Sequence, residues 1–402
     1  MKTETRSLMI VQSILSRLMP AIYQGINSML LSESNLFQPI KLGSLELKNR
    51  VVMAPMTRTF SPDGIPNDLS VAYYQRRAKN EVGLIITEGT CVGHKAANGY
   101  PNVPFIYGEK ALAGWKKVVD AVHAEGGKIV PQIWHVGAIR RADKGAGPDP
   151  SIPGYSPSGL IMKGKKTGIA MTTMDIQETI DAFVQAAVDS QNIGFDGVEL
   201  HGAHGYLLDQ FFWEDTNQRD DKYGGSIAAR TQIVVEIVEG IREKCGPDFP
   251  IILRFSQWKQ QAYGAKLANT PDELEQFLLP LSNAGVDIFH CSTRRFGESE
   301  FEGSDLNLAG WTKKITGKPC ITVGSIGLNN SFIDEDKRDM VDSSKATNDS
   351  FENLSERLNN NEFELVAIGR ALLQDPEWVI KVRDNRMDEL VDYSKESLTK
   401  LY

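Results

Sequence analysis

Short apolar runs alternate with longer amphipathic segments along most of the chain. Eight such runs, four to eight residues long and rich in Val and Ile, occur at 51–54, 83–89, 128–135, 197–201, 251–255, 286–290, 320–323 and 365–369. Continuous apolar runs of this length are typical of strands that are covered on both faces of a sheet. The pattern therefore predicts eight strands.

The segments between these runs have the apolar spacing of amphipathic helices. We expect helices at 68–80, 109–126, 176–194, 226–246 and 270–285. Thr270 followed by Pro271 suits an N-cap and the first helical position. Gly126, Gly246 and Gly285 lie where a glycine just past a helix end is expected.

Eight strand-helix units in one chain favour closure into a single α/β domain, a (β/α)₈ or TIM barrel. The alternative is an open doubly wound sheet. Against that alternative, no GxGxxG motif follows the first predicted strand, where the sequence reads "VVMAPMTRTFSPDG". We therefore expect the barrel to occupy residues 35–402.

Three segments fall outside this repeat. Residues 136–175 and 329–352 are polar or rich in Gly and Pro, and we interpret them as insertions into the barrel. Residues 1–34 have apolar positions at helical intervals and predict an appended helix that packs on the body or on a partner. A membrane-surface helix or a targeting segment is the rival reading, which Glu4 and the scarcity of arginine disfavour.

Composition narrows the class of protein. The hydrophobic fraction of 41% is enough for a large core, and the formal charge of −8 argues against a nucleic-acid or anionic-membrane partner. No run of apolar residues is long enough to span a bilayer. The four cysteines lie far apart without CxxC pairs, so we expect reduced thiols and a cytoplasmic protein that acts on small molecules.

Polar residues and glycines gather where the predicted strands end, which is where a (β/α)₈ barrel builds its chemistry. The candidate site residues at these ends are Ala54, Pro55, Met56, Thr57, Gly89, Gln132, Trp134, His201, His204, Tyr206, Arg254, Gly324, Ser325, Gly369 and Arg370. The glycine turns after the last two strands, 323–327 and 368–373, predict a phosphate site. Arg370 would add a guanidinium to that site.

His201 and His204 follow the fourth strand and admit three interpretations. As metal ligands they would need a third ligand, which the acids between 199 and 214 supply only if the chain folds back. In a structural role, one of them would donate to a backbone carbonyl. In the interpretation that we favour, both N–H groups hold a carbonyl oxygen on which negative charge develops, and Tyr206 donates a proton.

Arg254 follows three apolar residues in the fifth strand. An uncompensated buried charge costs several kcal/mol, so this guanidinium must have a partner. One candidate is an acid on a neighbouring strand, such as Glu199, and the other is an anionic ligand.

These residues belong to six motifs that occur in order along the chain. The motifs are "LFQPIKLGSLELKNRVVMAPMTR" 36–58, "EGT" 88–90, "PQIWHVG" 131–137, "LHGAHGYLLDQF" 200–211, "RFS" 254–256 and "AIGRALLQDP" 367–376. Together they resemble the Old Yellow Enzyme family of FMN-dependent ene-reductases, from about Leu36 to the end of the sequence. The resemblance implies noncovalent FMN, NAD(P)H as co-substrate, and reduction of the C=C bond of an α,β-unsaturated carbonyl compound by hydride transfer through flavin N5 in a ping-pong cycle.

The resemblance also implies roles for the candidate residues. The phosphate of FMN would be held by Gly324, Ser325, Gly369 and Arg370. The other cofactor-binding positions would include Ala54, Pro55, Met56 and Gly89. Thr57 would hydrogen-bond the flavin O4 region, Gln132 the pyrimidine edge, and Arg254 would lie beside N1 and O2. His201 and His204 would bind the substrate oxygen, Tyr206 would protonate the α-carbon, and Trp134 would line the substrate pocket.

The chain departs from the family pattern in one position, because many members have Asn where this chain has His204. This leaves reactivity toward nitro compounds and quinones open. A larger branch of the superfamily carries a four-cysteine iron–sulfur cluster and a second flavin domain, and we expect neither here. The alternative functions are a metal-dependent (β/α)₈ hydrolase or aldolase that uses His201 and His204, and a non-catalytic flavin-binding protein. The sequence is also compatible with a homo-oligomer.

Overall fold

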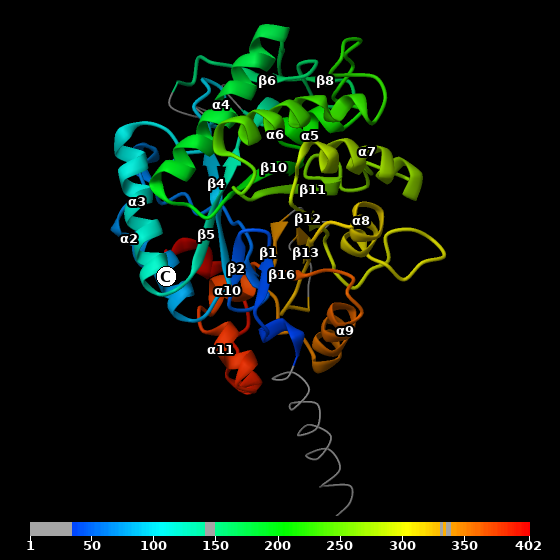
Figure 1. The fold of residues 1–402 in the computed structure, drawn as a ribbon. Helices are drawn as coiled ribbons and strands as arrows, with labels where there is room; N and C mark the ends of the chain where they lie inside the picture. The colour runs from blue at the N-terminus through cyan, green and yellow to red at the C-terminus, as the bar shows by residue number, and fades with distance from the viewer. Residues whose placement is uncertain (1–33, 141–148, 330–332, 335–338) are drawn as a thin grey trace, which may run out of the picture.

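A closed barrel of eight parallel strands forms the centre of the described part of the molecule (Figure 1). The computed structural model describes residues 34–140, 149–329, 333–334 and 339–402. The barrel strands are β3 (Val51–Met53), β4 (Leu84–Cys91), β5 (Lys128–Trp134), β10 (Val198–His204), β11 (Ile251–Lys259), β12 (Ile288–Ser292), β13 (Cys320–Val323) and β16 (Leu365–Ile368). The last strand pairs with the first, Val366 beside Val51, which closes the cylinder. The predicted (β/α)₈ barrel is confirmed, and the alternative of an open doubly wound sheet is wrong.

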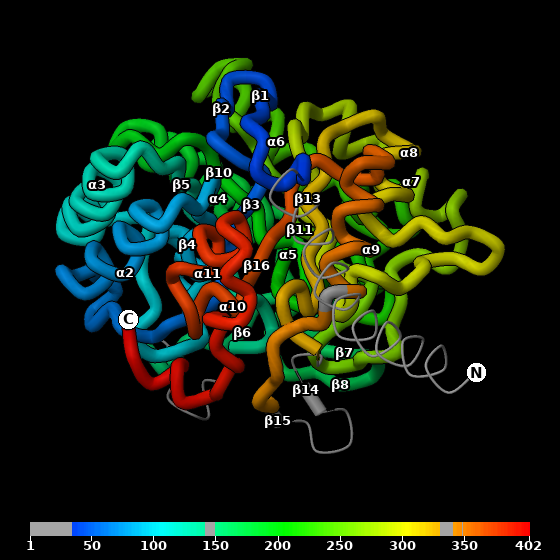
Figure 2. Tube along the Cα trace, turned by 90° about the horizontal axis from the view of Figure 1, so that it is seen from below, coloured from blue at the N-terminus to red at the C-terminus, as the bar shows by residue number. Residues whose placement is uncertain are grey.

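Helices cover the outside of the barrel, with α2 and α3 on one side and α7 and α8 on the other (Figure 2). The helices that the apolar spacing predicted are α2 (Asp68–Lys79), α3 (Glu109–Ala124), α4 (Thr173–Ile193), α6 (Gln232–Cys245) and α7 (Pro271–Ala284). The Thr270 side chain accepts a hydrogen bond from the Glu273 backbone N–H, and Gly285 adopts the left-handed conformation, so both predicted end signals of α7 are confirmed.

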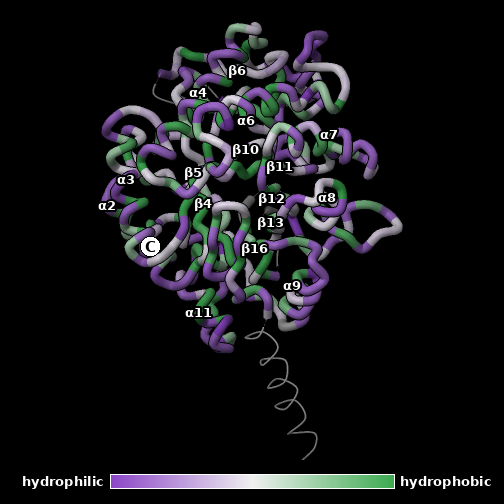
Figure 3. The backbone as a smooth tube through the Cα atoms, in the orientation of Figure 1, coloured by the Kyte–Doolittle hydropathy of each residue, from purple (hydrophilic) through white to green (hydrophobic). Residues whose placement is uncertain are grey.

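The core has two layers because each barrel strand buries both of its faces. Apolar residues that point into the cylinder, among them Val52, Ile86 and Ile252, pack with Leu45 and Leu47. The last two come from a hairpin of β1 (Ile40–Leu42) and β2 (Leu45–Leu47). The hairpin therefore closes the amino end of the strands with apolar side chains. Figure 3 shows the hydrophobic colour concentrated along the strands and the inward sides of the helices.

The first predicted insertion forms small strands instead of an irregular loop. It contains β6 (Gly154–Ser156), β7 (Leu160–Met162), β8 (Lys165–Lys166) and β9 (Gly168–Ala170). β6 pairs with β9 and β7 with β8, and Figure 1 shows the group at the top of the molecule, beside α5 (Leu207–Phe212).

The second predicted insertion contains the short strands β14 (Ile333–Asp334) and β15 (Asp339–Met340) and the start of α9 (Asn348–Asn359). Further helices that the sequence did not indicate are α8 (Leu308–Thr316), α10 (Arg370–Gln374) and α11 (Trp378–Arg383). The helix predicted within residues 1–34 lies outside the described residues, apart from Ser34. In the portion that the structure describes, there is no helix with the length and apolarity needed to cross a membrane.

Candidate functional site

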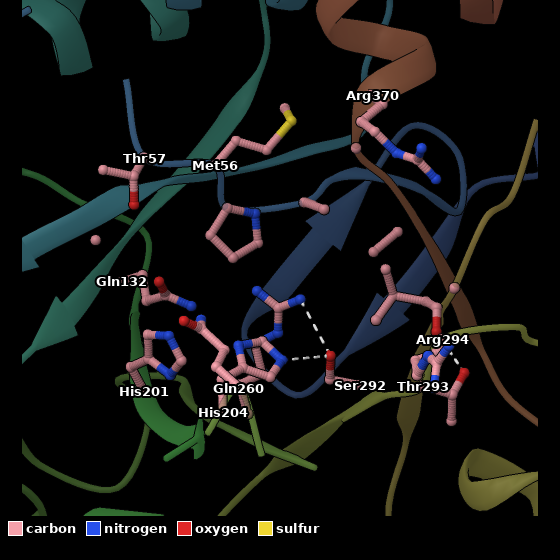
Figure 4. Close-up of a pocket in the computed structure, with 18 of the residues that line it drawn as sticks. Met56, Thr57, Gln132, His201, His204, Gln260, Ser292, Thr293, Arg294 and Arg370 are labelled. Carbon is pink, nitrogen blue, oxygen red and sulfur yellow. Dashed lines mark hydrogen bonds between the residues drawn. The ribbon is translucent and has the colours of Figure 1, made fainter. Parts of the chain in front are cut away.

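A cavity of about 510 Å³ opens at the carboxyl ends of the barrel strands. Every one of the predicted site residues lines it: Ala54, Pro55, Met56, Thr57, Gly89, Gln132, Trp134, His201, His204, Tyr206, Arg254, Gly324, Ser325, Gly369 and Arg370. Figure 4 shows His201 and His204 together at one end and Arg370 at the other. The structure thus brings together residues that lie more than three hundred positions apart in the sequence.

The sequence missed several lining residues. They are Arg58, Thr59, Trp258, Gln260, Tyr263, Ser292, Thr293, Arg294, Val323, Ile326, Leu328, Ala367, Leu373 and Leu398. Trp258 and Ser292 were missed because β11 and β12 run to Lys259 and Ser292, beyond the apolar runs that predicted them. Signals were available for some of them, because Arg58 directly follows Thr57, Val323 and Ile326 lie in the predicted turn 323–327, and Ala367 and Leu373 lie in the motif 367–376.

The two site histidines form a pair of neutral hydrogen-bonding groups. The ring centroids of His201 and His204 are 5.3 Å apart with planes at 89°. Burial, followed by the charge of Arg254, holds the pKa of both imidazoles well below the usual range. Each ring is therefore uncharged near neutral pH and carries one N–H donor.

Their neighbours differ. His204 Nε2 lies 2.8 Å from Ser292 Oγ, whereas His201 Nδ1 is buried and has no partner among the described residues. Trp258 stacks on the His204 ring with centroids 4.5 Å apart. In the part of the chain that the structure describes, no group of three or more His, Cys, Asp or Glu is arranged to hold a metal ion.

Hydrogen bonds from buried polar side chains stabilise the turn that contains His204. His204 has a positive φ of 63°, a conformation that costs a non-glycine residue free energy. Its backbone N–H donates to Ser256 Oγ at 3.0 Å, and the next N–H, of Gly205, donates to Asp209 Oδ2 at 2.6 Å. Lys259 Nζ donates to Asp209 Oδ1 at 2.5 Å and to the Ser256 carbonyl at 3.1 Å. These bonds fix a backbone geometry that the residues alone would not favour.

Tyr206 presents its phenol to the cavity from the start of α5. Its Oη lies 3.3 Å from Tyr100 Oη and 3.5 Å from Gln260 Nε2. The Trp134 ring packs against Tyr206 edge-on, with centroids 4.9 Å apart. Burial raises the pKa of Tyr206 well above that of free tyrosine, so the phenol keeps its proton at neutral pH.

Arg254 has no carboxylate partner in hydrogen-bond contact within the described residues. Its Nη2 reaches Ser292 Oγ at 3.4 Å, and its Nε is buried without a partner among the described residues. The Glu199 carboxylate is used elsewhere, because Oε1 accepts from Gln132 Nε2 at 2.7 Å and Oε2 lies 2.6 Å from His290 Nδ1. The alternative ion pair with Glu199 is therefore wrong as a direct contact.

The hydrogen bond to Glu199 orients the Gln132 amide at the cavity wall. One N–H of the amide donates to the carboxylate, and Gln132 keeps a second N–H donor and its amide oxygen as an acceptor.

The far end of the cavity is lined by glycines and cations. A Cβ on Gly369 would meet Met56 Sδ at 3.6 Å and Ala54 Cβ at 3.8 Å, which are ordinary contacts, so this backbone borders free space. Gly324 has φ +150° and a Cβ there would lie 2.7 Å from Thr293 Oγ1, so only glycine fits. Four arginines and no Asp or Glu occur among the described residues that line the cavity: Arg58, Arg254, Arg294 and Arg370. Such a lining favours an anionic ligand.

Known proteins with similar sequences and structures share this architecture. A family model described as the NADH:flavin oxidoreductase / NADH oxidase family matches residues 35–347. Flavin oxidoreductase hxnT of Emericella nidulans is 34% identical over 378 residues, which cover 90% of this chain and 93% of hxnT. NADH oxidase of Thermoanaerobacter brockii is 34% identical over 368 residues, or 89% of this chain, and the chain spans only 52% of that protein's length.

Solved structures of flavin oxidoreductases are similar to this chain over most of its length. Morphinone reductase in complex with tetrahydroNAD is 29% identical, with a TM-score of 0.74 over 90% of this chain and 94% of that chain. Old Yellow Enzyme from Pichia sp. AKU4542 is 28% identical, with a TM-score of 0.76 over 92% of this chain and 91% of that chain.

Proposed function

Because the chain belongs to the NADH:flavin oxidoreductase / NADH oxidase family, the family of Old Yellow Enzyme, we propose that it reduces the activated C=C bond of α,β-unsaturated carbonyl compounds with NAD(P)H. It is a flavin-dependent oxidoreductase whose cofactor is FMN and whose co-substrate is a nicotinamide nucleotide. The observation that carries the proposal is the convergence of two neutral imidazoles and one buried phenol on the cavity that Arg254 also lines.

The cavity fits FMN in its donors and in its free space. The buried Arg254 Nε has no partner among the described residues, which suits an electron-rich edge of the flavin ring. At the opposite end Gly369 borders open space beside Arg370, which suits a phosphate. When bound there, FMN supplies the hydride carrier that accepts from NAD(P)H and gives to the enone.

The residues of the chain bind and orient the substrate. His201 and His204 donate hydrogen bonds to the carbonyl oxygen, where negative charge develops as the β-carbon accepts hydride. Neutral imidazoles suit this task, because they can donate without adding a full charge to a buried site. Tyr206 gives its proton to the α-carbon, and Trp134 forms the wall beside it.

Three further residues orient FMN itself. Gln132 would hydrogen-bond the flavin ring through its amide oxygen and its remaining N–H, and Thr57 would hydrogen-bond the O4 region. Arg254 would stabilise negative charge on the ring by a charge-assisted hydrogen bond. Ser325 and Gly324 complete the phosphate end.

The test separates the two half-reactions. The purified protein should be yellow and release FMN on denaturation, and NAD(P)H should bleach the flavin band anaerobically. Mixing the reduced protein with 2-cyclohexen-1-one should restore the band. Tyr206→Phe should slow this second step by about a hundredfold or more while leaving the first step within about twofold of the unaltered protein.

Tyr107→Phe is the matched control, because Tyr107 stacks on Phe105 and is not among the residues that line the cavity. It should alter neither step. Reduced protein that no enone reoxidises, or a Tyr206→Phe variant in which both steps slow equally, would refute the proposal.

A further inference from the structure

We propose that Tyr100 passes a proton to Tyr206 in the same step in which Tyr206 protonates the substrate, through the direct contact between the two phenol oxygens. The proposal rests on the function proposed above, in which Tyr206 gives its proton to the substrate. It adds a second tyrosine, outside the cavity lining, that acts through the first.

Packing of both tyrosines against Trp134 holds the two phenol hydroxyls next to each other. Tyr100 stacks on Trp134 with ring centroids 5.5 Å apart and an interplanar angle of 21°. Trp134 in turn packs edge-on against Tyr206. The loop behind Tyr100 is closed by Asn98, whose Oδ1 accepts from the Tyr100 backbone N–H at 2.9 Å. Ring packing and the Asn98 hydrogen bond therefore maintain the separation of 3.3 Å between the two hydroxyl oxygens.

Hydrogen-bond directions favour delivery toward Tyr206. A phenol has one proton to donate, and its oxygen can accept from others. Gln260 Nε2 can only donate, and it points to Tyr206 Oη from 3.5 Å. If Tyr206 directs its own proton into the cavity, Tyr100 must be the donor in the contact between the phenols. Tyr206 Oη then accepts from two groups while it donates to the substrate.

The difference in burial between the two tyrosines favours transfer of the negative charge from the Tyr206 oxygen to the Tyr100 oxygen. Tyr206 is only 6% exposed, whereas Tyr100 is half-buried. Burial raises the pKa of both phenols, but that of Tyr206 stands well above its usual value and that of Tyr100 is less displaced. A negative charge is thus more stable on Tyr100, which lies nearer to water.

The proton balance is simple. The Tyr206 O–H bond breaks as the α-carbon forms its C–H bond, and in the same step Tyr100 gives its proton to the Tyr206 oxygen and becomes the phenolate. Water then protonates Tyr100, so the chain returns to its starting state with one solvent proton consumed. The hydride comes from the nicotinamide nucleotide through FMN, as in the proposed reaction.

The experiment compares four proteins in the single-turnover reoxidation by 2-cyclohexen-1-one: unaltered protein, Tyr100→Phe, Tyr206→Phe and the double variant. Phenylalanine keeps the stacking on Trp134 and removes only the hydroxyl. With Tyr206 present, Tyr100→Phe should slow reoxidation about tenfold, the scale of one hydrogen bond to a charged group. In the Tyr206→Phe background the same change should have no effect, because no phenolate forms there.

Two further variants separate a relay from other causes. Gln260→Leu removes a hydrogen-bond donor that cannot deliver its proton, so reoxidation should slow but should keep a solvent isotope effect of two moving protons. Tyr100→Phe should reduce the solvent isotope effect to that of one moving proton. Tyr107→Phe should change neither rate nor isotope effect. The rate of flavin reduction and the FMN content should be equal in all variants, which shows that the cavity is intact.

Equal slowing by Tyr100→Phe in both backgrounds would mean that Tyr100 merely supports the fold, and no slowing in either would mean that Tyr206 is reprotonated elsewhere. Each result overturns the relay and leaves the proposed function standing. Failure of the unaltered reduced protein to react with the enone would overturn both.

Discussion

Lys259 Nζ lies 2.5 Å from Asp209 Oδ1, and neither side chain has exposed surface. The pair joins the bulged end of β11, where the register shifts and His204 pairs with Lys259, to the helix α5 that follows β10. Asp209 uses its second oxygen to hold the Gly205 N–H. Two buried charges thus stabilise the strained residue that is expected to bind the substrate oxygen.

Asp209→Ala should destabilise the protein by about 3–5 kcal/mol, because it leaves the Lys259 ammonium buried and unpaired. It should also weaken the binding of a phenolic ligand, since the His204 turn loses its support. Urea unfolding and titration of the ligand-induced absorption band measure the two effects. Glu364→Ala, which breaks the part-buried pair with Lys313 at the other end of the barrel, should lower stability without changing phenol affinity.

Gly369→Ala should fold normally and bind FMN poorly. Its added Cβ meets only ordinary contacts in the protein, so the free energy of unfolding of the apoprotein should stay within about 1 kcal/mol. The methyl group would occupy space assigned to the phosphate, so the dissociation constant for FMN should rise at least about tenfold, as measured by flavin fluorescence quenching. Gly324→Ala is the contrasting variant and should impair folding itself. Unchanged FMN affinity in Gly369→Ala would place the phosphate elsewhere.

His204→Asn should keep part of the oxygen-binding function, whereas His204→Ala should lose it. Asn offers an amide N–H in place of the imidazole N–H, and Ala offers none. We expect phenol affinity to fall by about tenfold in the Asn variant and by about a hundredfold in the Ala variant. The visible band that a phenol induces over the flavin reports binding directly. Equal affinity in both variants would remove His204 from the ligand contact.

The stability of the protein should rise with pH through the slightly acidic range. Burial lowers the pKa of His94 to about 4, and it lowers the pKa of His135, His201 and His204 well below the usual range. The unfolded chain, with ordinary histidines, takes up these protons first. Stability is therefore fully present above about pH 6.5 and is lost as the pH falls toward 4. Urea unfolding at several pH values measures the slope.

Buried carboxyls oppose this trend, because burial raises the pKa of Glu88, Asp209 and Glu300. The pKa of Glu88 rises to about 7, so this group alone would make stability fall as the pH rises from about 4.5 to 7. Burial also lowers the pKa of His290, and we expect the five buried histidines to outweigh the carboxyls. A flat profile would mean that the buried imidazoles are solvated or protonated in the folded state.

Much of the fold was predictable because it depends on local patterns. Continuous apolar runs locate the barrel strands, and Thr270 and Gly285 mark the two ends of α7. The short helix α8 escaped prediction since its cap depends on tertiary support: Asn307, which accepts from the Gly310 N–H, is itself held by donating to the Phe296 carbonyl at 2.8 Å. The strands β6 to β9 pair only with one another, and sequences of two or three residues are too short to carry a periodic signal.

The positions of site residues were predictable where they directly follow a predicted strand. Their hydrogen-bond partners were less predictable. Strand ends located the site histidines and Arg254, whose placement at the cavity is confirmed, although their roles stay predictions. That Glu199 would bind Gln132 and His290 instead of Arg254 is a matter of geometry across three strands, which no spacing encodes. Tyr100 was missed for the same reason, because it meets Tyr206 from a different loop.

The pairing of Val366 with Val51 makes the cavity a late product of folding. Until the first and last barrel strands pair, the residues that we assign to the flavin ring and to its phosphate lie on strands that are not yet joined, and such long-range pairings form slowly. We therefore expect FMN to bind only after the barrel has closed. Bound FMN should then stabilise the closed barrel against unfolding.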